Sequence, residues 1–332
     1  MKFRRKLAAV LAGIITVTAF SGCSMLGNQA TNALGTYDFT QMDLVQLNKP
    51  SEGQDVAVIE TNLGTITAVL YAEFAPKTVA NFKKRAEEGF YDGKPFFALQ
   101  KGIYAITGAS NDEGTEGVTD DGKFIENECS VNLWPFKGAL LGYSSQQGYS
   151  DSRFFFTGAL EITEENKKEL RGYTDQETSA QVIPDELITA FEKRGSVPGF
   201  AGTYTVFGQV INGFDTLDKI LWSASDKSTM KPLEEIKIVK VTLDSYKDGK
   251  FTIEEPTSDK YLTAEEIADQ VVAFQHMPHA QVVGIIEAIS KELRHLLLKG
   301  FSVELGDIGY FTLSLSVDKE VTKPKALRSP SV

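Results

Sequence analysis

The stretch GFYDGKPFFALQKGIYAITGAS, residues 89–110, decides the fold of this chain. Its glycines separate short runs of apolar and aromatic residues, and the pattern predicts several short strands from here to about residue 157. Three apolar side chains, Phe97, Ala98 and Ile106, stand in the middle of the stretch. None of them can donate a hydrogen bond or exchange a proton, which limits the chemistry available there.

Segments on both sides of this stretch supply the other predicted elements. Residues 56–60 and 65–71 are rich in β-branched side chains and flank a TNLG turn at 61–64, which predicts a hairpin. A helix is predicted from Ala75, because Pro76 suits the first helical turn and apolar residues then recur on one face. Farther along we expect a charged helical insertion and two more strands, at residues 161–195, 203–211 and 236–243.

Four motifs follow one another as they do in a single known family: APKTVANF at 75–82, GFYDG at 89–93, SRFF at 152–155 and TVFGQV at 205–210. On these motifs, residues 53–245 resemble a cyclophilin-type peptidyl-prolyl cis-trans isomerase of the bacterial lipoprotein form. The resemblance implies a mainly β fold, an eight-stranded closed antiparallel barrel with capping helices. The helical insertion is an addition to that barrel.

The resemblance also implies a chemistry, and the residues that perform it are missing here. In the family, an arginine guanidinium donates toward the prolyl nitrogen and weakens the amide resonance, while an apolar pocket holds the proline ring. The arginine position is Ala98 in this chain, and the position of a glutamine that contacts the peptide backbone is Ile106. No catalytic side chain of the family is intact, so the resemblance implies weak or lost activity.

The remaining groove positions are more apolar and aromatic than those of the family. The side chains expected to line the substrate groove are Phe96, Ile103, Tyr104, Ile106, Tyr143, Phe155, Phe200 and Tyr204. Arg153 is a candidate substitute for the missing guanidinium, because it stands on the expected rim of this groove. The alternative is that Arg153 pairs with Asp151 or points into solvent, since catalysis tolerates little displacement of a donor.

The N-terminus is typical of an export signal that ends in a lipid anchor. Basic residues precede an apolar run at 7–20, which is short for a membrane span, and FSGC at 20–23 resembles the lipobox of bacterial lipoproteins. We expect a signal peptide at 1–22, a lipid on Cys23 and a flexible tether at 23–52. An uncleaved N-terminal anchor is the alternative. Both place the body of the chain on the extracytoplasmic face of the cell membrane.

The C-terminal segment has a different character. After a predicted linker at 246–260, residues 261–332 are expected to form two helices and a β-hairpin. The pattern GFSVELGDIGYF at 300–311 resembles HU-like, DNABII-type DNA-binding domains, of which this tail is a truncated form. From residue 260 the chain has 8 basic and 9 acidic residues, whereas DNA binding needs an excess of cations. A dimerisation or packing module at 261–315 is the alternative.

The charge and the residue composition limit the partners and cofactors that the chain is expected to bind. The formal net charge is −11, which disfavours nucleic acid as a partner of the main domain. The three histidines have no carboxylate or cysteine to complete a metal site, so neither a metal nor a cofactor is expected. Cys129 has no histidine before residue 276 to activate its thiol, and we expect it to be a small core or loop residue.

The sequence therefore predicts a membrane-anchored lipoprotein with an isomerase-type domain that acts on proline-containing exported polypeptides and has weak or lost activity. One alternative is a non-catalytic peptide-binding or chaperone-like module, and a second is DNA binding through the tail. The pairing of an export signal with an HU-like tail leaves two origins open, a genuine fusion and a truncated or joined reading frame.

Overall fold

The computed structural model of the chain describes residues 36–173, 182–256, 278–299, 302–304 and 310–311. The chain divides into two compact units, Met1–Ser258 and Asp259–Val332. The predicted signal peptide, the lipidation site Cys23 and the first predicted helix of the tail lie outside the described residues.

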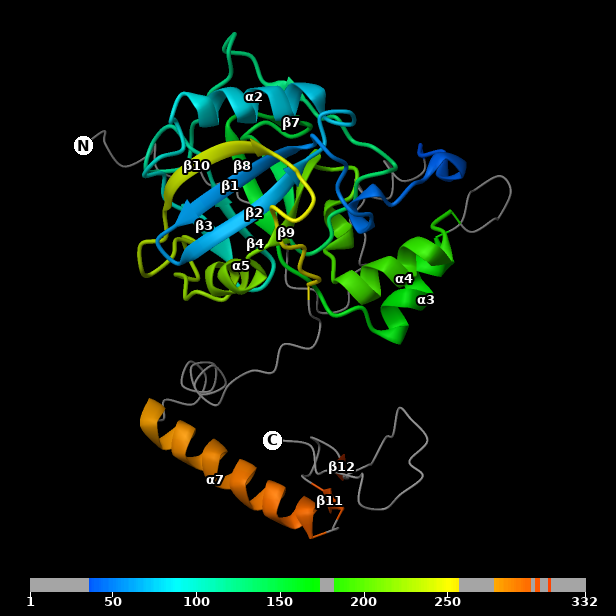
Figure 1. Ribbon diagram of the computed structural model, residues 1–332, viewed down its shortest axis with the longest axis vertical. Helices are drawn as coiled ribbons and strands as arrows, with labels where there is room; N and C mark the ends of the chain where they lie inside the picture. The colour runs from blue at the N-terminus through cyan, green and yellow to red at the C-terminus, as the bar shows by residue number, and fades with distance from the viewer. Residues whose placement is uncertain (1–35, 174–181, 257–277, 300–301, 305–309, 312–332) are drawn as a thin grey trace, which may run out of the picture. The chain divides into compact units, whose positions relative to one another are not determined.

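An antiparallel sheet of eight strands dominates the first unit (Figure 1). The strands follow one another across the sheet in the order β10-β1-β2-β9-β6-β8-β4-β3, so neighbours in space are seldom neighbours in sequence. Their bounds are β1 Asp55–Thr61, β2 Gly64–Leu70, β3 Ala98–Gln100, β4 Tyr104–Thr107, β6 Ala139–Tyr143, β8 Arg153–Thr157, β9 Val206–Asn212 and β10 Ile238–Ser245.

The sheet is curled but open between its end strands, so the prediction of a closed barrel is wrong in this respect. All three residues of β3 pair with β4, and none of them forms a ladder with β10. The two edges meet near the start of β10, where Phe96 N donates to Ile236 O at 2.8 Å and Ile238 N donates to Lys94 O at 2.9 Å. The other edge of β3 is used by a different segment: Leu99 N donates to Met230 O at 2.7 Å, so the loop before β10, and not β10 itself, lies along β3.

Two helices cover opposite ends of the curled sheet, as predicted (Figure 1). Helix α2, Pro76–Glu87, packs beside β10, and helix α5, Phe214–Leu221, packs beside β2. Inside the sheet, the Phe82 ring of α2 lies 5.4 Å from the ring centroids of both Phe154 and Phe207. These buried aromatic side chains form the centre of the core that faces the helices.

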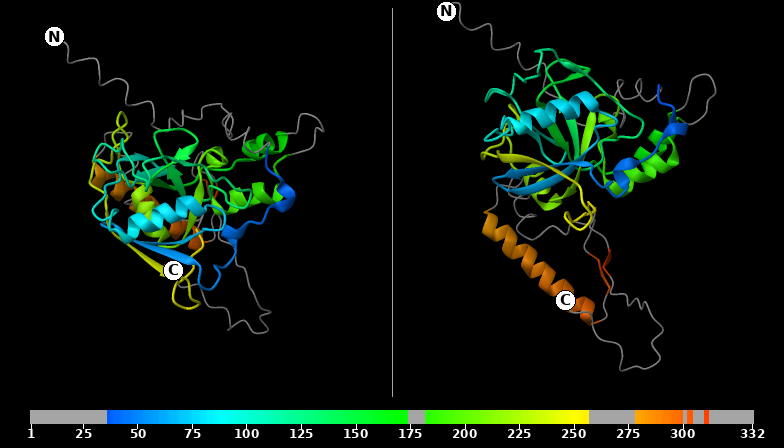
Figure 2. Two further views of the ribbon diagram at one scale, coloured as in Figure 1. Left: turned by 90° about the horizontal axis from the view of Figure 1, so that it is seen from above. Right: turned by 45° about the horizontal axis from the view of Figure 1, so that its top comes forward.

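The predicted helical insertion is present and has a core of its own. It contains α3, Glu164–Gly172, and α4, Asp185–Arg194. The segment that follows residue 36 packs against it and carries two short 3-10 helices, η2 Phe39–Gln41 and η3 Val45–Leu47. Figure 2 shows this segment in blue beside the green helices. Trp134 sits in this cluster, with its ring 6.0 Å from that of Phe39 and 5.8 Å from that of Phe191.

Two segments predicted to connect other parts of the chain, the tether and the linker, are packed where the structure describes them. The tether predicted at 23–52 is packed from residue 36 onward, because its apolar residues cover Trp134. The predicted linker 246–260 is packed as far as residue 256: Tyr246 is buried, and the Glu254 carboxylate accepts from Gly213 N at 2.9 Å at the start of α5.

Smaller elements complete the described chain. In the first unit, β5 Ile125–Glu126 pairs with β7 Tyr149–Ser150, and the 3-10 helix η4 spans Pro198–Phe200. The second unit has a helix and a hairpin, as predicted: α7 His279–Leu298, followed by β11 Val303–Glu304 paired with β12 Tyr310–Phe311. Among the described residues, no helix combines the length and the apolar character that a membrane crossing requires.

Candidate active site

The register of four neighbouring strands brings the central site positions into one row. Ala98 of β3 lies opposite Ile106 of β4, Ile106 lies opposite Phe155 of β8, and Phe155 lies opposite Leu141 of β6. Residues directly opposite in an antiparallel ladder point to the same face, so these four side chains are neighbours. All four are buried. The two positions expected to carry the polar chemistry therefore place a methyl group beside a branched alkyl group, and neither supplies a donor.

Three aromatic rings cover Phe155, the expected floor of the proline pocket. Its ring centroid lies 5.1 Å from that of Tyr204, 5.4 Å from that of Phe200 and 6.2 Å from that of Tyr104. The contacts are edge-on, the arrangement that aromatic pairs prefer. Phe155 and Tyr104 are 0% exposed and Phe200 is 4% exposed. These rings therefore pack around Phe155 and leave its side chain without exposed surface, while Tyr204 itself is only partly buried.

The other predicted groove residues fall into two places. Ile103 and Tyr143 join the cluster around Phe155, with Ile103 half-buried and Tyr143 buried. Phe96 does not: its ring stacks on that of Phe156, 6.3 Å away, in the core that faces α2 and α5. Phe97, which was not predicted as a groove residue, packs against the Phe155 cluster in its place.

The phenols in this cluster are neutral. Burial raises the pKa of Tyr104 and of Tyr204 far above the ordinary value, because desolvation disfavours the phenolate. Burial also raises the pKa of Tyr143, although the nearby Arg153 opposes the shift. None of these side chains can therefore stabilise developing charge as an anion near neutral pH.

Arg153, the candidate substitute guanidinium, is committed to an ion pair. Its Nε donates to Asp151 Oδ1 at 3.0 Å, its Nη2 donates to Asp151 Oδ2 at 2.5 Å, and its Nη1 donates to Gly114 O at 2.9 Å. The guanidinium lies over the Tyr143 ring at 5.2 Å, and the side chains of Arg153 and Asp151 are each 1% exposed. All three nitrogens of the guanidinium donate within the protein, and solvent does not reach it.

A loop that contains glycine, residues 110–118, packs against Arg153 at the expected rim of the substrate groove. A Cβ on Gly114, which has a φ of +75°, would lie 2.1 Å from the Phe97 ring, so only glycine allows this close approach. Val118 N donates to Ser152 Oγ at 3.0 Å and holds the end of the loop. The loop places the carbonyl of Gly114 on Arg153, where it accepts one of the guanidinium's hydrogen bonds.

Other reactive groups do not add chemistry to the site. Burial raises the pKa of the Cys129 thiol to about 11, so the thiol is protonated near neutral pH. Within the described ranges, no three His, Cys, Asp or Glu side chains come together as metal ligands. His279 and His295 belong to α7 of the second unit, and His276 lies outside the described residues.

Replacement of Arg153 by alanine should cost stability. Arg153→Ala leaves the Asp151 carboxylate buried without its partner, and we expect it to lower the free energy of unfolding by about 3–5 kcal/mol. Arg171→Ala on α3 is the matched control, because its ion pair with Asp185 is exposed and should be worth about 0–1 kcal/mol. Urea unfolding of both variants measures the difference. Equal stability of the two variants would contradict the buried ion pair.

Two family models match the chain. Residues 56–243 match the model described as cyclophilin type peptidyl-prolyl cis-trans isomerase/CLD. Residues 245–332 match a second model, described as an HU domain fused to wHTH, Ig or a glycine-rich motif. The second match agrees with the resemblance of the tail to HU-like proteins.

Curated relatives match the first unit. A Staphylococcus aureus (strain COL) protein, provisionally named a peptidyl-prolyl cis-trans isomerase, is 30% identical over 200 residues, which are 60% of this chain and 97% of the relative. A Staphylococcus epidermidis protein with the same name is 30% identical over 178 residues, 53% of this chain and 85% of the relative. A solved cyclophilin type isomerase of Cryptosporidium parvum is 25% identical, with a TM-score of 0.45, and the match covers 59% of this chain and 99% of that one.

The family model covers more than half of the chain, and the matched residues span the curled sheet, its two covering helices and the row from Ala98 to Phe155. This chain therefore belongs to the cyclophilin-type peptidyl-prolyl cis-trans isomerase family.

Proposed function

We propose that this protein is a lipid-anchored member of the family that binds exported polypeptides and has little or no isomerase activity. One observation carries the proposal: the position of the catalytic arginine is Ala98, and the rings of Tyr104, Phe200 and Tyr204 cover Phe155. The site therefore lacks both the donor and the open pocket that the reaction requires.

The energy barrier of the reaction explains why the missing donor and the covered Phe155 would both matter. Rotation about an X-Pro bond must overcome a barrier of about 18–20 kcal/mol that arises from amide resonance. Only interactions that are stronger in the twisted state than in the planar state accelerate it. Removing one well-placed donor of this kind costs about two to three orders of magnitude in rate. A proline ring would in addition have to displace Tyr104 or Tyr204 before it could reach Phe155.

A second candidate is a non-catalytic peptide-binding or chaperone-like module. The filled pocket favours it, because a polypeptide could then bind the surrounding surface without a proline being inserted. DNA binding through the HU-like tail has less support: the chain carries a formal net charge of −11, and its last residues, from 260, hold 8 basic and 9 acidic groups.

The partners follow from the proposed location. With a lipid on Cys23, the protein would be held on the extracytoplasmic face of the cell membrane and would meet proline-containing polypeptides as they are exported. Residues 261–315 could pair two copies of the chain through the tail, the alternative use of an HU-like segment that does not bind DNA.

The isomerase activity can be measured directly. Full-length protein should catalyse cis-trans exchange of an alanyl-proline peptide at least about 100-fold less efficiently than a cyclophilin that retains its arginine. Ala98→Arg alone should restore little, because the rings around Phe155 stay in place. Ala98→Arg combined with Ile106→Gln and with Tyr204→His, which restores the histidine that the family resemblance implies at that position, should gain more. NMR exchange spectroscopy gives both rates.

A wild-type efficiency within tenfold of the arginine-bearing cyclophilin would contradict the proposal. A large gain from Ala98→Arg by itself would show that the pocket accepts proline and that only the donor is missing.

The lipid anchor has its own test. In a bacterial host that processes lipoproteins, the wild-type chain should fractionate with membranes and gain the mass of a diacylglyceryl group at Cys23. Cys23→Ser should lose that mass, because the modified thiol is absent. Cys129→Ser is the control and should retain the modification. Lipid incorporation that persists in Cys23→Ser would overturn the assignment of the anchor.

A further inference from the structure

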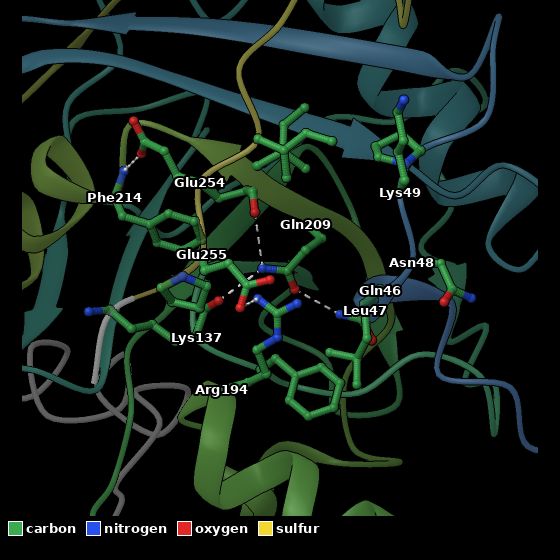
Figure 3. A pocket seen from close by; sticks show the side chains of 16 residues that line it. Gln46, Leu47, Asn48, Lys49, Lys137, Arg194, Gln209, Phe214, Glu254 and Glu255 are labelled. Atoms are coloured by element: carbon green, nitrogen blue, oxygen red, sulfur yellow. Dashed lines mark hydrogen bonds and ion pairs between the residues drawn. The ribbon is translucent and has the colours of Figure 1, made fainter. Parts of the chain in front are cut away.

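A cavity of about 230 Å³ lies at a junction of three segments that stand outside the eight-stranded sheet. Its walls come from residues 46–50, from the end of α4 at Arg194 and from residues 253–256, which meet over β9 (Figure 3). None of the residues predicted for the substrate groove lines it, so this cavity is separate from the filled site around Phe155.

The lining of the cavity contains apolar side chains and a fixed pair of amides. The apolar lining consists of Leu47, Pro50, Phe136, Val210, Ile211, Phe214, Ile253 and Pro256. In the amide pair, Gln46 Nε2 donates to Gln209 Oε1 at 2.9 Å, and Gln209 Nε2 donates to Lys137 O at 2.9 Å. Because these amides satisfy each other and the backbone, they line the cavity without adding charge.

Most of the charges around the cavity are already neutralised. Lys137 Nζ lies 2.9 Å from an oxygen of Asp218, and both side chains are largely buried. Lys49 pairs with Asp248 at 2.6 Å. The Glu254 carboxylate accepts from backbone amides at the start of α5 and is thereby committed.

Arg194 has an ion-pair partner that is exposed to solvent. Its Nη1 lies 3.3 Å from Glu255 Oε2, and within the described part of the chain the guanidinium makes no other polar contact. The Glu255 side chain is 77% exposed, whereas that of Arg194 is 20% exposed, so the carboxylate reaches in from solvent. Figure 3 shows the two side chains meeting in the cavity near Gln209. An exposed ion pair of this kind contributes little, so another carboxylate can replace Glu255 at small cost.

We propose that this cavity binds a carboxylate that carries an apolar group. The ligand's carboxylate takes the place of Glu255 on Arg194, in the two-pronged geometry that a guanidinium favours, and its hydrocarbon part lies against apolar side chains of the lining. A volume of 230 Å³ equals that of about eight water molecules, which suits one amino acid residue and little more. The source is either a free small carboxylate or the C-terminal residue of a polypeptide.

Calorimetric titration of the full chain tests the carboxylate site independently of any isomerase activity. The probes are N-acetyl-leucine, a hexapeptide that ends in leucine, and the same hexapeptide with an amidated C-terminus. We expect at least one acid probe to bind, and the amide to bind at least about tenfold more weakly than the acid because it cannot pair with Arg194.

Variants assign the effect to the two charged groups. Arg194→Gln should weaken binding of the acid by about tenfold or more, and Glu255→Gln should strengthen it about two- to fivefold by removing the competing carboxylate. Arg171→Gln, on the exposed surface of α3, should leave the affinity unchanged.

The possible results of these titrations lead to different conclusions. Binding of N-acetyl-leucine and the acid peptide alike identifies a free carboxylate as sufficient, and binding of the acid peptide alone identifies a polypeptide C-terminus. Failure of both acid probes, equal binding of acid and amide, or an Arg194→Gln variant with wild-type affinity would each overturn the proposal.

Discussion

The ladder register across β3, β4, β8 and β6 is the constraint on which the rest of the site depends. It holds Ala98 beside Ile106 and Ile106 beside Phe155, and a slip of one residue would turn each of these buried side chains to the opposite face of the sheet. The sheet therefore fixes the position of the family's reaction site while the side chains at that position are apolar. The cyclophilin-type scaffold is therefore present, with Ala98 at the position expected for the family's arginine.

The side chains around this row convert an open site into a packed one. Each fully buried large apolar side chain contributes about 1.5–3 kcal/mol to folding, so the burial of Phe155 and Phe200 stabilises the packed arrangement, and Tyr204 packs on them while partly exposed. At the rim, Arg153 and Asp151 pair with their charges buried, and the loop at 110–118 lies over them. Under the proposed function, these packed contacts contribute to stability at the positions where catalysis would need an open site.

Sequence patterns predicted the helices, strands and turns more accurately than they predicted how these elements pack together. The β-branched runs at 56–60 and 65–71 and the GFYDG motif located strands and turns, because their periodicity and glycines are local signals. The packing of residues 36–52 could not be read in the same way. It depends on contacts such as that of Gln46 with Gln209, which join residues far apart in sequence. The opening beside β3 depends on the contact of Leu99 with Met230, which no local pattern in either segment indicates.

For the candidate site, too, the sequence predicted the residues better than it predicted how they pack. Alignment to family motifs identified Ala98 and Ile106 as the changed positions and Phe155 as the pocket floor, but it placed Phe96 in the groove although that ring stacks on Phe156 in the core. The packing of Tyr104, Phe200 and Tyr204 around Phe155 joins segments far apart in sequence, so the motifs alone do not predict it. The most direct test is a crystal structure of the protein soaked with alanyl-proline. The account predicts these three rings in place over Phe155 with no dipeptide against it, and a proline ring seated on Phe155 with Tyr104 or Tyr204 turned away would contradict it.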